Sequence, residues 1–323
     1  MSREQGDWQG YDIIGDIHGC ANTLEKLLQK MGYERCDGVY CHPYRQAIFL
    51  GDVVDRGPHI REALHLVKNM VDRGSALCIM GNHEFNAICY TTPAPPSSGL
   101  DHVRPHSSRH NRLIAETLDQ FADFPEEWDM FLQWFRTLPL FLEMPGFRVV
   151  HACWDQRLVD EYKARYGDSL LRDELVLESM DPHSFAGQVF DRLTRGTGIP
   201  LPRGTTITGR DGYVRESFRT KFWAHNPKTY RDVVFQPDPL PEGIADRPLS
   251  AVENEQLLSY GVDEPPVFVG HYWLQGNPRP LRSNVACLDY SAVKFGRLVA
   301  YRFDGESKLS ADKFVWVYVD PQN

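Results

Sequence analysis

The 323-residue sequence lacks any apolar run that approaches the roughly 20 residues of a membrane-spanning helix. Its first ten residues, MSREQGDWQG, contain no apolar core, and so we expect no signal peptide and no membrane association. The chain also lacks an excess of basic residues, because 44 Asp and Glu outnumber 35 Lys and Arg and give a formal net charge of −9. A general nucleic-acid-binding protein usually carries a basic surface, which argues against that function.

The cysteines lack the spacing of a metal site. Seven are present, an odd number, and none belongs to a CxxC pair. Cys36 and Cys41 are separated by four residues, but no second pair completes a zinc site. We therefore expect reduced thiols in a cytoplasmic protein. Apolar residues make up 42% of the chain, as is ordinary for a globular protein that buries a substantial core.

Five short apolar runs are each followed by residues that commonly bind metals. The runs are YDIIG, QAIFLG, ALCIMG, FRVV and PVFVG, and their lengths of about 4 to 6 residues fit buried strands. The polar residues that follow them are Asp16, His18, Asp52, Asn82, His83, His151 and His271. Because ligands at the carboxyl ends of such strands share one crevice in an α/β sheet, we expect these side chains to converge.

Helical patterns separate the first three runs. Residues 21–31 and 59–74 place apolar residues at spacings of three, four and seven, as amphipathic helices do. The resulting β-α-β-α-β order predicts parallel strands with right-handed crossovers. Toward the C-terminus, residues 284–293, 297–305 and 313–319 alternate like antiparallel strands.

Residues 91–111 are rich in Pro and Ser and are expected to form a loop insertion. They contain His102, His106 and His110, which are spaced by four residues as metal ligands on a helix could be. Pro105 disfavours that helix, and so we interpret these histidines as part of a solvated loop.

Residues 156–265 form a long insertion between the last two histidines of the series. They begin with a helical pattern and then become irregular. Within them, residues 208–231 carry six Lys and Arg against two Asp and Glu, a local charge of +4. We interpret residues 156–265, hereafter the cap segment, as a cap over the site within a single domain of residues 1–323.

The ligand set contains carboxylate oxygens, one amide oxygen and imidazole nitrogens, without sulfur. This set suits Mn²⁺, Fe or Zn²⁺. Even six of these seven residues are too many protein ligands for one catalytic metal that must keep open positions. They fit two ions about 3.5–4 Å apart that share a bridging carboxylate and a bridging water, a pair that can form hydroxide near neutral pH and clamp phosphoryl oxygens.

Other polar residues beside the runs receive structural interpretations. Cys20 and Cys153 are expected to be small packing residues. Asp12 is expected to face solvent at the start of its strand.

The motifs DxHG at 16–19, GDxxDRG at 51–57 and GNHE at 81–84, with two later histidines, resemble the calcineurin-like metallophosphoesterase superfamily. The full GDxxDRG and GNHE forms are similar to its phosphoprotein phosphatase branch, which includes serine/threonine phosphatases, diadenosine tetraphosphatases and small bacterial relatives. The segment 284–305 resembles the bacterial side of that branch. The resemblance implies an α/β fold, a β-sandwich of two mixed sheets flanked by helices, with the metals at one edge.

The resemblance also implies a role for each motif residue. The ligands would be Asp16, His18 and Asp52 for one divalent ion and Asp52, Asn82, His151 and His271 for the other, with Asp52 as the bridge. Mn²⁺ is the expected metal, with Fe or Zn²⁺ as alternatives. His83 would be a general acid and not a ligand. Asp55 would orient its imidazole and raise its pKa, and Arg56 would grip phosphate oxygens.

Protein phosphatases of this branch carry a further phosphate-binding arginine between the last two histidine ligands. The candidates in this chain are Arg195, Arg203, Arg210, Arg215 and Arg219. Arg215 and Arg219 lie in the basic part of the cap segment and are the preferred pair. The alternative interpretation of this basic part is a solvated face.

The reaction that the resemblance implies is direct attack of a metal-bridging hydroxide on a phosphomonoester. No Ser or Cys lies in a nucleophile motif, in agreement with a reaction without a phosphoenzyme. A phosphoprotein is one possible substrate, and a nucleotide polyphosphate such as a diadenosine compound is the alternative. A nuclease is a weaker alternative, because the GHxH ending of such relatives is GHYW here. A non-catalytic binding module is the rival from another class, but no ligand is missing.

Overall fold

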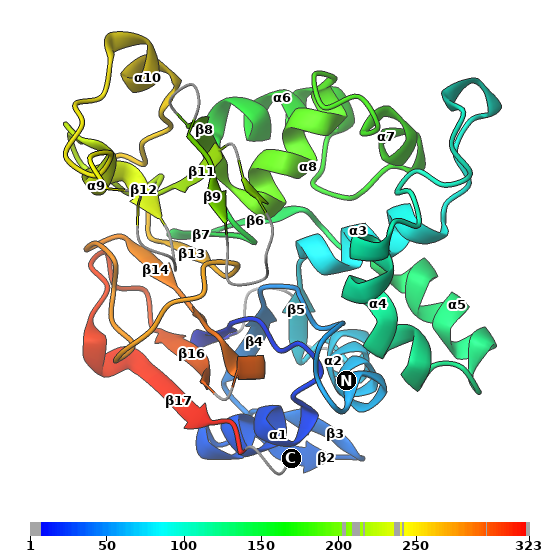
Figure 1. Cartoon of the computed structure of the whole chain (residues 1–323). Coiled ribbons are helices and arrows are strands. Elements are labelled where there is room, and N and C mark those ends of the chain that lie inside the picture. The colour runs from blue at the N-terminus through cyan, green and yellow to red at the C-terminus, as the bar shows by residue number, and fades with distance from the viewer. Residues whose placement is uncertain are drawn as a thin grey trace.

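The computed structural model describes residues 8–201, 205–208, 214–215, 217–235, 240, 242–294 and 296–320. Its centre consists of two mixed sheets (Figure 1). The first has the order β15 (Asp289–Tyr290), β16 (Arg297–Phe303), β1 (Gly10–Ile14), β4 (Arg45–Phe49) and β5 (Ala76–Cys78), and β17 (Phe314–Tyr318) also pairs with β16. The second has the order β14 (Val285–Cys287), β13 (Val267–Val269), β7 (Phe147–Val150) and β6 (Phe141–Met144).

An apolar core joins the two sheets face to face. Ile13 and Ile48 of the first sheet share one buried cluster with Phe147 and Phe268 of the second, and all four are at most 1% exposed. Burial of both inner faces in a common core is the packing of a β-sandwich. The predicted fold class, two mixed sheets flanked by helices, is therefore confirmed.

The predicted β-α-β-α-β series is present. β1 pairs parallel with β4, and β4 pairs parallel with β5. The intervening helices, α1 (Ala21–Lys30) and α2 (Ile60–Asp72), bury one apolar face each in a second core cluster that also contains Ile14 and Phe49. This arrangement fixes the carboxyl ends of three parallel strands at one edge of the sheet.

The hairpin of β2 (Glu34–Cys36) and β3 (Val39–Cys41) was not predicted, and it corrects the expectation of seven reduced thiols. Glu34 lies opposite Cys41 and Cys36 lies opposite Val39. This pairing brings the Cα atoms of the two cysteines to 6.0 Å, within the usual range for a disulfide, and the structure joins them. The other five cysteines are free and buried.

The expectation of antiparallel strands near the C-terminus was right for β15, β16 and β17, which pair antiparallel. It was wrong for β14, which joins the second sheet parallel to β13. An alternating pattern indicates a strand but does not determine the direction of its partner.

The segment 91–111 runs from the end of α3 (Asn82–Thr91) through the short 3₁₀ helix η1 (Pro96–Ser98) to the start of α4 (Ser108–Gln120), which α5 (Pro125–Phe135) follows. The ring of His106 stacks on Tyr90 and on His102. Ring nitrogens of His106 and His110 lie 2.9 and 2.7 Å from backbone carbonyls. Apart from η1, the chain between Thr91 and Ser108 is a loop as expected, but His110 lies in the first turn of α4.

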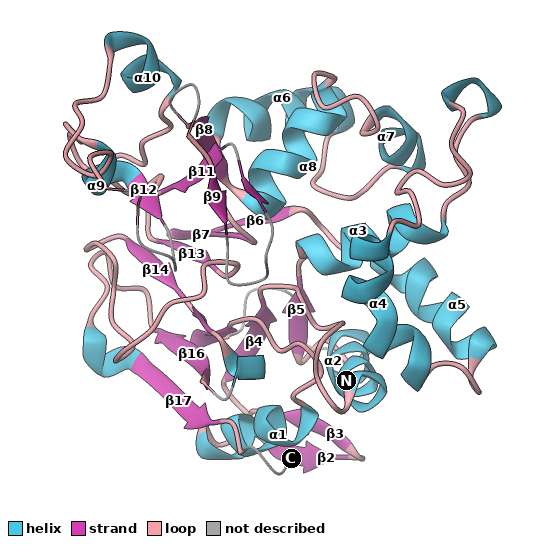
Figure 2. Cartoon of the chain, viewed as in Figure 1, coloured by secondary structure: helices cyan, strands magenta, loops and turns pink. Residues whose placement is uncertain are grey.

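The cap segment contains more regular structure than its sequence indicated. Its helices are α6 (Gln156–Tyr166), α7 (Asp173–Glu178), α8 (Phe185–Arg195), α9 (Tyr230–Val233) and α10 (Ala251–Gln256). Its strands are β8 (Thr197–Pro200), β9 (Ile207–Thr208), β10 (Val214–Arg215), β11 (Ser217–Thr220) and β12 (Val234–Phe235). The sheet β12-β11-β8 has a small core of its own, with Ile199, Phe218 and Tyr230. These elements lie beyond the second sheet (Figure 2).

The short 3₁₀ helices η2 (Ala292–Lys294) and η3 (Ala311–Lys313) complete the described elements. None of the helices in the described part of the chain has the length and apolar character that crossing a membrane requires.

Candidate dinuclear metal site

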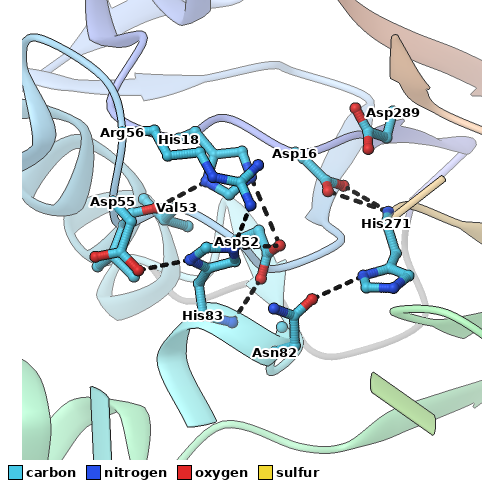
Figure 3. Close-up of polar contacts among 12 residues, drawn as sticks. Asp16, His18, Asp52, Val53, Asp55, Arg56, Asn82, His83, His271 and Asp289 are labelled. Carbon is cyan, nitrogen blue, oxygen red and sulfur yellow. Dashed lines mark hydrogen bonds and ion pairs between the residues drawn. The ribbon is translucent and has the colours of Figure 1, made fainter. Parts of the chain in front are cut away.

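The polar residues that follow β1, β4, β5, β7 and β13 come together at one edge of the sandwich. Most of them are drawn in Figure 3, where Asp16, His18, Asp52, Asn82, His83 and His271 surround one region. All of these side chains and that of His151 are buried, with exposed fractions from 0 to 8%. The first sheet supplies three of the motifs and the second sheet supplies His151 and His271, so the site spans both sheets.

Asp52 lies at the centre of this group. Its Oδ2 atom is 3.3 Å from Nε2 of His151, 3.6 Å from Nε2 of His18 and 3.9 Å from Nε2 of His83. These nitrogens approach one carboxylate oxygen from different motifs. Such a carboxylate can bridge two cations.

Asn82 occupies the corresponding position between the two later histidines. Its Oδ1 atom lies 3.2 Å from Nε2 of His151 and 2.7 Å from Nδ1 of His271. The other ring nitrogen of His271, Nε2, is buried and has no hydrogen-bond partner among the described residues. A buried polar atom without a partner is costly, and a metal ion is one partner that an imidazole nitrogen can take.

Asp16 lies slightly apart from the other predicted ligands. Two described groups have ligand atoms within 4.8 Å of one another: His18, Asp52 and His83, and Asp52, His151 and His271. The Asp16 carboxylate instead accepts the backbone N–H of His271, at 3.0 Å to Oδ2. The first group thus contains His83 where the resemblance implies Asp16.

The ring of His83 is held on both sides. Its Nδ1 atom lies 2.5 Å from Oδ2 of Asp55, and Arg56 donates to its Nε2 atom at 2.9 Å. Because a guanidinium has only donors, the ring proton is on Nδ1 and points at Asp55. The hydroxyl of Thr117, from α4, donates to the other oxygen of Asp55 and accepts its backbone N–H. Thr117 was not identified from the sequence.

Glu84 ties the GDxxDRG and GNHE motifs together. This fully buried carboxylate accepts four backbone N–H groups at 2.8–3.3 Å, those of Asp52, Val53, Val54 and Gly81. The loops therefore keep their relative position through one side chain. Gly81 is required there, because a Cβ atom on it would lie 2.2 Å from Oδ1 of Asp52.

The backbone at the site is strained. Eight non-glycine residues in the described part of the chain have positive φ, and five belong to the motifs: His18, Asp52, Asp55, Arg56 and His271, with φ from 44° to 72°. Non-glycine residues in this region cost on the order of 1–3 kcal/mol each and persist where surrounding contacts enforce them. The contacts here orient side chains toward one another.

The pKa values of the buried histidines are shifted in different directions. Burial lowers the pKa of His18 and of His271 well below the usual value, with further lowering by Arg56 and Arg219 respectively, so both rings are neutral. Burial also lowers the pKa of His151, but Asp52 raises it more, to about 10. Burial raises the pKa of Asp52, yet His151 and His83 bring it well below its usual value.

A further carboxylate, Asp289 on β15, lies beside Asp16 in Figure 3. It is 2% exposed, and burial raises its pKa to about 6. Burial and the charge of Asp289 together raise the pKa of Asp16 well above its usual value. The sequence did not single out Asp289, because no recognised motif contains it.

A cavity of about 300 Å³ lies between α8, β8, β11 and the segment after His271. Its lining includes Arg109, Arg195, Ser217, Arg219, Phe235 and Trp273. The guanidinium of Arg56 lies 4.8 Å from the centre of the Trp273 ring, which places the cavity next to the buried site.

Of the predicted cap arginines, Arg219 lines this cavity, and its guanidinium lies 5.9 Å from the ring of Tyr272. Arg195 lines it as well and donates to Oδ1 of Asn86 at 2.7 Å. Arg215 is on β10, but its side chain lies outside the described part of the structure, as do Arg203 and Arg210 entirely.

The donor set fits a pair of divalent ions. Buried carboxylate oxygens, an amide oxygen and imidazoles, which bind metals as neutral rings, are ligands that Mn²⁺, Fe and Zn²⁺ accept. The convergence of three histidine nitrogens on Asp52, and of two on Oδ1 of Asn82, supports this fit.

The chain is similar to several known proteins. The asymmetrical bis(5′-nucleosyl)-tetraphosphatase PrpE of Halalkalibacterium halodurans is 49% identical over 74 residues, 23% of this chain. The match spans only 30% of that relative's length. A candidate diadenosine tetraphosphatase structure is 17% identical and covers 98% of this chain and 96% of its own, with a TM-score of 0.48. A serine/threonine phosphatase structure from Saccharomyces cerevisiae, with similarity to human PP5, is 15% identical and covers 99% and 82%, with a TM-score of 0.49.

The family of the chain is decided by its match to a family model and not by these individual likenesses. The model for the calcineurin-like phosphoesterases matches residues 11–272, which include every motif of the site. The chain therefore belongs to the calcineurin-like phosphoesterase family.

Proposed function

We propose that this protein is a dinuclear-metal-dependent phosphohydrolase that cleaves a phosphomonoester by direct attack of water. The observation that carries the proposal is the convergence of three histidine nitrogens on one oxygen of Asp52, with the His83–Asp55 pair beside it. We assign Asp16, His18, Asp52, Asn82, His151 and His271 as the ligands. When bound, two divalent ions supply a nucleophile at neutral pH and clamp phosphoryl oxygens.

We assign His83 as the general acid for the leaving group. Nε2 of His83 accepts a hydrogen bond from Arg56 and carries no proton in this arrangement, so it can act as an acid only after Arg56 turns away and Nε2 takes up a proton. A phosphate group would draw Arg56 off, because a guanidinium binds phosphate oxygens with paired hydrogen bonds. Substrate binding would thus free Nε2 to take up a proton from solvent, which the ring would then pass to the leaving-group oxygen, while Asp55 and Thr117 keep the ring in place.

We further propose that the cap segment covers the substrate side of the site and that Arg219 assists Arg56. Arg219 lines the cavity next to Trp273, and its charge reaches His271. Arg215 remains a candidate for the same role.

A specific observation favours a second candidate, hydrolysis of a nucleotide polyphosphate. Three arginines, Arg109, Arg195 and Arg219, line one cavity beside the site and outnumber the single acidic residue of its lining, Asp191. The sequence likeness to a bis(5′-nucleosyl)-tetraphosphatase over 74 residues points the same way. In this interpretation the cavity holds the phosphates that are not attacked.

A panel assay tests both candidates. The purified protein with Mn²⁺ is given an aryl phosphate, phosphopeptides and dinucleoside polyphosphates at equal concentration, and kcat/KM is compared. The highest value on a phosphopeptide supports the first candidate, and the highest value on a dinucleoside polyphosphate supports the second. Hydrolysis of none of them, by protein shown to contain metal, would refute the phosphohydrolase assignment.

A further inference from the structure

A second buried carboxylate beside Asp16 has no role in the proposed reaction. Asp289 is 2% exposed, and its Oδ1 atom accepts the backbone N–H of Ser291 at 2.9 Å. Its Oδ2 atom is buried and accepts no hydrogen bond from the described residues. Figure 3 shows the carboxylates of Asp289 and Asp16 on the same side of the site, next to His271.

The backbone fixes these two carboxylates next to each other. Leu288, just before Asp289, donates its N–H to the carbonyl of Val269 at 2.8 Å. Gly15, just before Asp16, packs so closely that a Cβ atom on it would lie 2.1 Å from the carbonyl oxygen of Leu288. Only glycine permits this approach. The fold therefore brings the backbone before Asp16 close to the backbone before Asp289.

Charges of both signs act on Asp289: Asp52 opposes its ionisation, whereas Arg56 and His151 favour it. The nearby Asp16 and Asp52 have the same sign. The positive charge of Arg56 is directed at His18 and His83, to which Arg56 donates at 3.3 and 2.9 Å. A buried carboxylate with an open oxygen and like-charged neighbours is unfavourable unless a cation or its hydration shell provides the missing partner.

We propose that Asp289 is an additional carboxylate of the metal site. It strengthens retention of the ion bound by Asp16 and His18 by adding negative charge and by accepting a hydrogen bond from that ion's hydration shell. Outer carboxylates of this kind typically change metal affinity by about 10–100-fold. The inference rests on the proposed function, because it assumes that the predicted ligands bind metal.

The test compares Asp289→Asn with Asp12→Asn. Asp12 is also buried, and it lies on β1 four residues before Asp16, but it is paired with Arg45 and Arg302 at 2.9 and 3.1 Å. Mn²⁺ binding to metal-stripped protein is measured by isothermal titration calorimetry and by electron paramagnetic resonance of the bound ion. Thermal melting is measured with and without Mn²⁺.

We expect Asp289→Asn to lower the affinity for one Mn²⁺ ion by about 10–100-fold and to leave the affinity for the other ion unchanged. The metal-stripped variant should melt no lower than the wild type, because a repulsive charge has been removed, but it should gain less stability from Mn²⁺. Asp12→Asn should melt lower and bind both ions normally. Asp289→Ala should reproduce the loss of affinity if the Asn variant does not fold.

Unchanged Mn²⁺ affinity in Asp289→Asn would overturn the proposal, and so would a lower melting temperature with normal affinity, which indicates a purely structural role. Failure of this proposal can be distinguished from failure of the proposed function. Wild-type protein that binds two Mn²⁺ ions but hydrolyses no phosphate ester would refute the proposed function alone, and wild-type protein that binds none would refute both.

Discussion

At the scale of single residues, His83 offers the sharpest test of the proposed reaction. We expect His83→Asn to lower kcat by on the order of 10²–10⁴-fold, because a positioned proton donor is lost. Metal content should stay near normal, since both ring nitrogens already contact Asp55 and Arg56. Steady-state kinetics and metal analysis of the purified variant provide the measurement.

A matched comparison of substrates sharpens this prediction. The loss should be smaller for aryl phosphates with acidic leaving groups, which need no proton. Because the structure also groups His83 with His18 and Asp52, an empty metal position in the variant would show that His83 is a ligand instead.

As a proposed ligand, His151 should make metal binding dependent on pH. Its pKa of about 10 means that the ring is protonated at neutral pH before a metal binds, whereas a metal ligand must be the neutral imidazole. Binding should therefore release a proton, and apparent Mn²⁺ affinity should rise with pH between about 6 and 9. Calorimetry in buffers of different ionisation enthalpy measures the released protons. Affinity that is flat across this window would contradict the prediction.

The residues that the sequence revealed are those in short, ordered motifs. Thr117 was not predicted because it lies 62 residues from Asp55 in the sequence, in a helix that contains no motif. Asp12 was wrongly expected to face solvent. Strand β1 is central, with β4 and β16 on either side, and Arg45 and Arg302 from those strands cover its carboxylate. Neighbours supplied by other strands cannot be identified from the local pattern of one strand.

At the scale of elements, the basic strand β11 of the cap segment provides a direct test. We expect Arg219→Ala to lower kcat/KM, because a charge-assisted contact is worth about 1.5–3 kcal/mol, roughly one to two decades in rate constant. Arg231→Ala is the matched control, since Arg231 belongs to the same basic part but is 64% exposed and pairs with Asp246. Equal, small effects of both changes would identify a solvated face.

The elements that were predicted correctly were those with a strong hydrophobic period in the sequence. All five apolar runs form strands that end one to four residues before the first candidate ligand, and both early helices form as expected. The amount of regular structure in the cap segment was underestimated. Its helix α8 has a buried apolar face and the cap residue Ser184, whose side chain accepts from Gly187 N–H, signals that were present in the sequence. The β2–β3 hairpin has three-residue strands, too short for a pattern to be recognised.

At the scale of the whole molecule, the site connects the two sheets. Asp16, Asp52 and Asn82 follow strands of the first sheet, and His151 and His271 follow strands of the second. Ions held by all five would cross-link the sandwich at one edge. We expect chelation to abolish hydrolysis and to lower the melting temperature of the entire molecule by several degrees, since a ligand at 100 times its Kd adds about 2.7 kcal/mol.

Addition of Mn²⁺ should restore both properties, and more effectively than Mg²⁺. Calorimetric melting and an aryl phosphate assay on the same samples provide the comparison. Full hydrolytic activity in thoroughly metal-stripped protein would refute the two-metal assignment.

The left-handed backbone of the motif residues has a consequence for how this protein responds to selection. His18, Asp52, Asp55, Arg56 and His271 hold conformations that glycine adopts without penalty. At Arg56, whose side chain is partly exposed, glycine would relieve strain while removing the guanidinium. A library screened only for heat resistance would therefore enrich glycine at this position and lose catalysis. Stability and turnover compete for the same backbone.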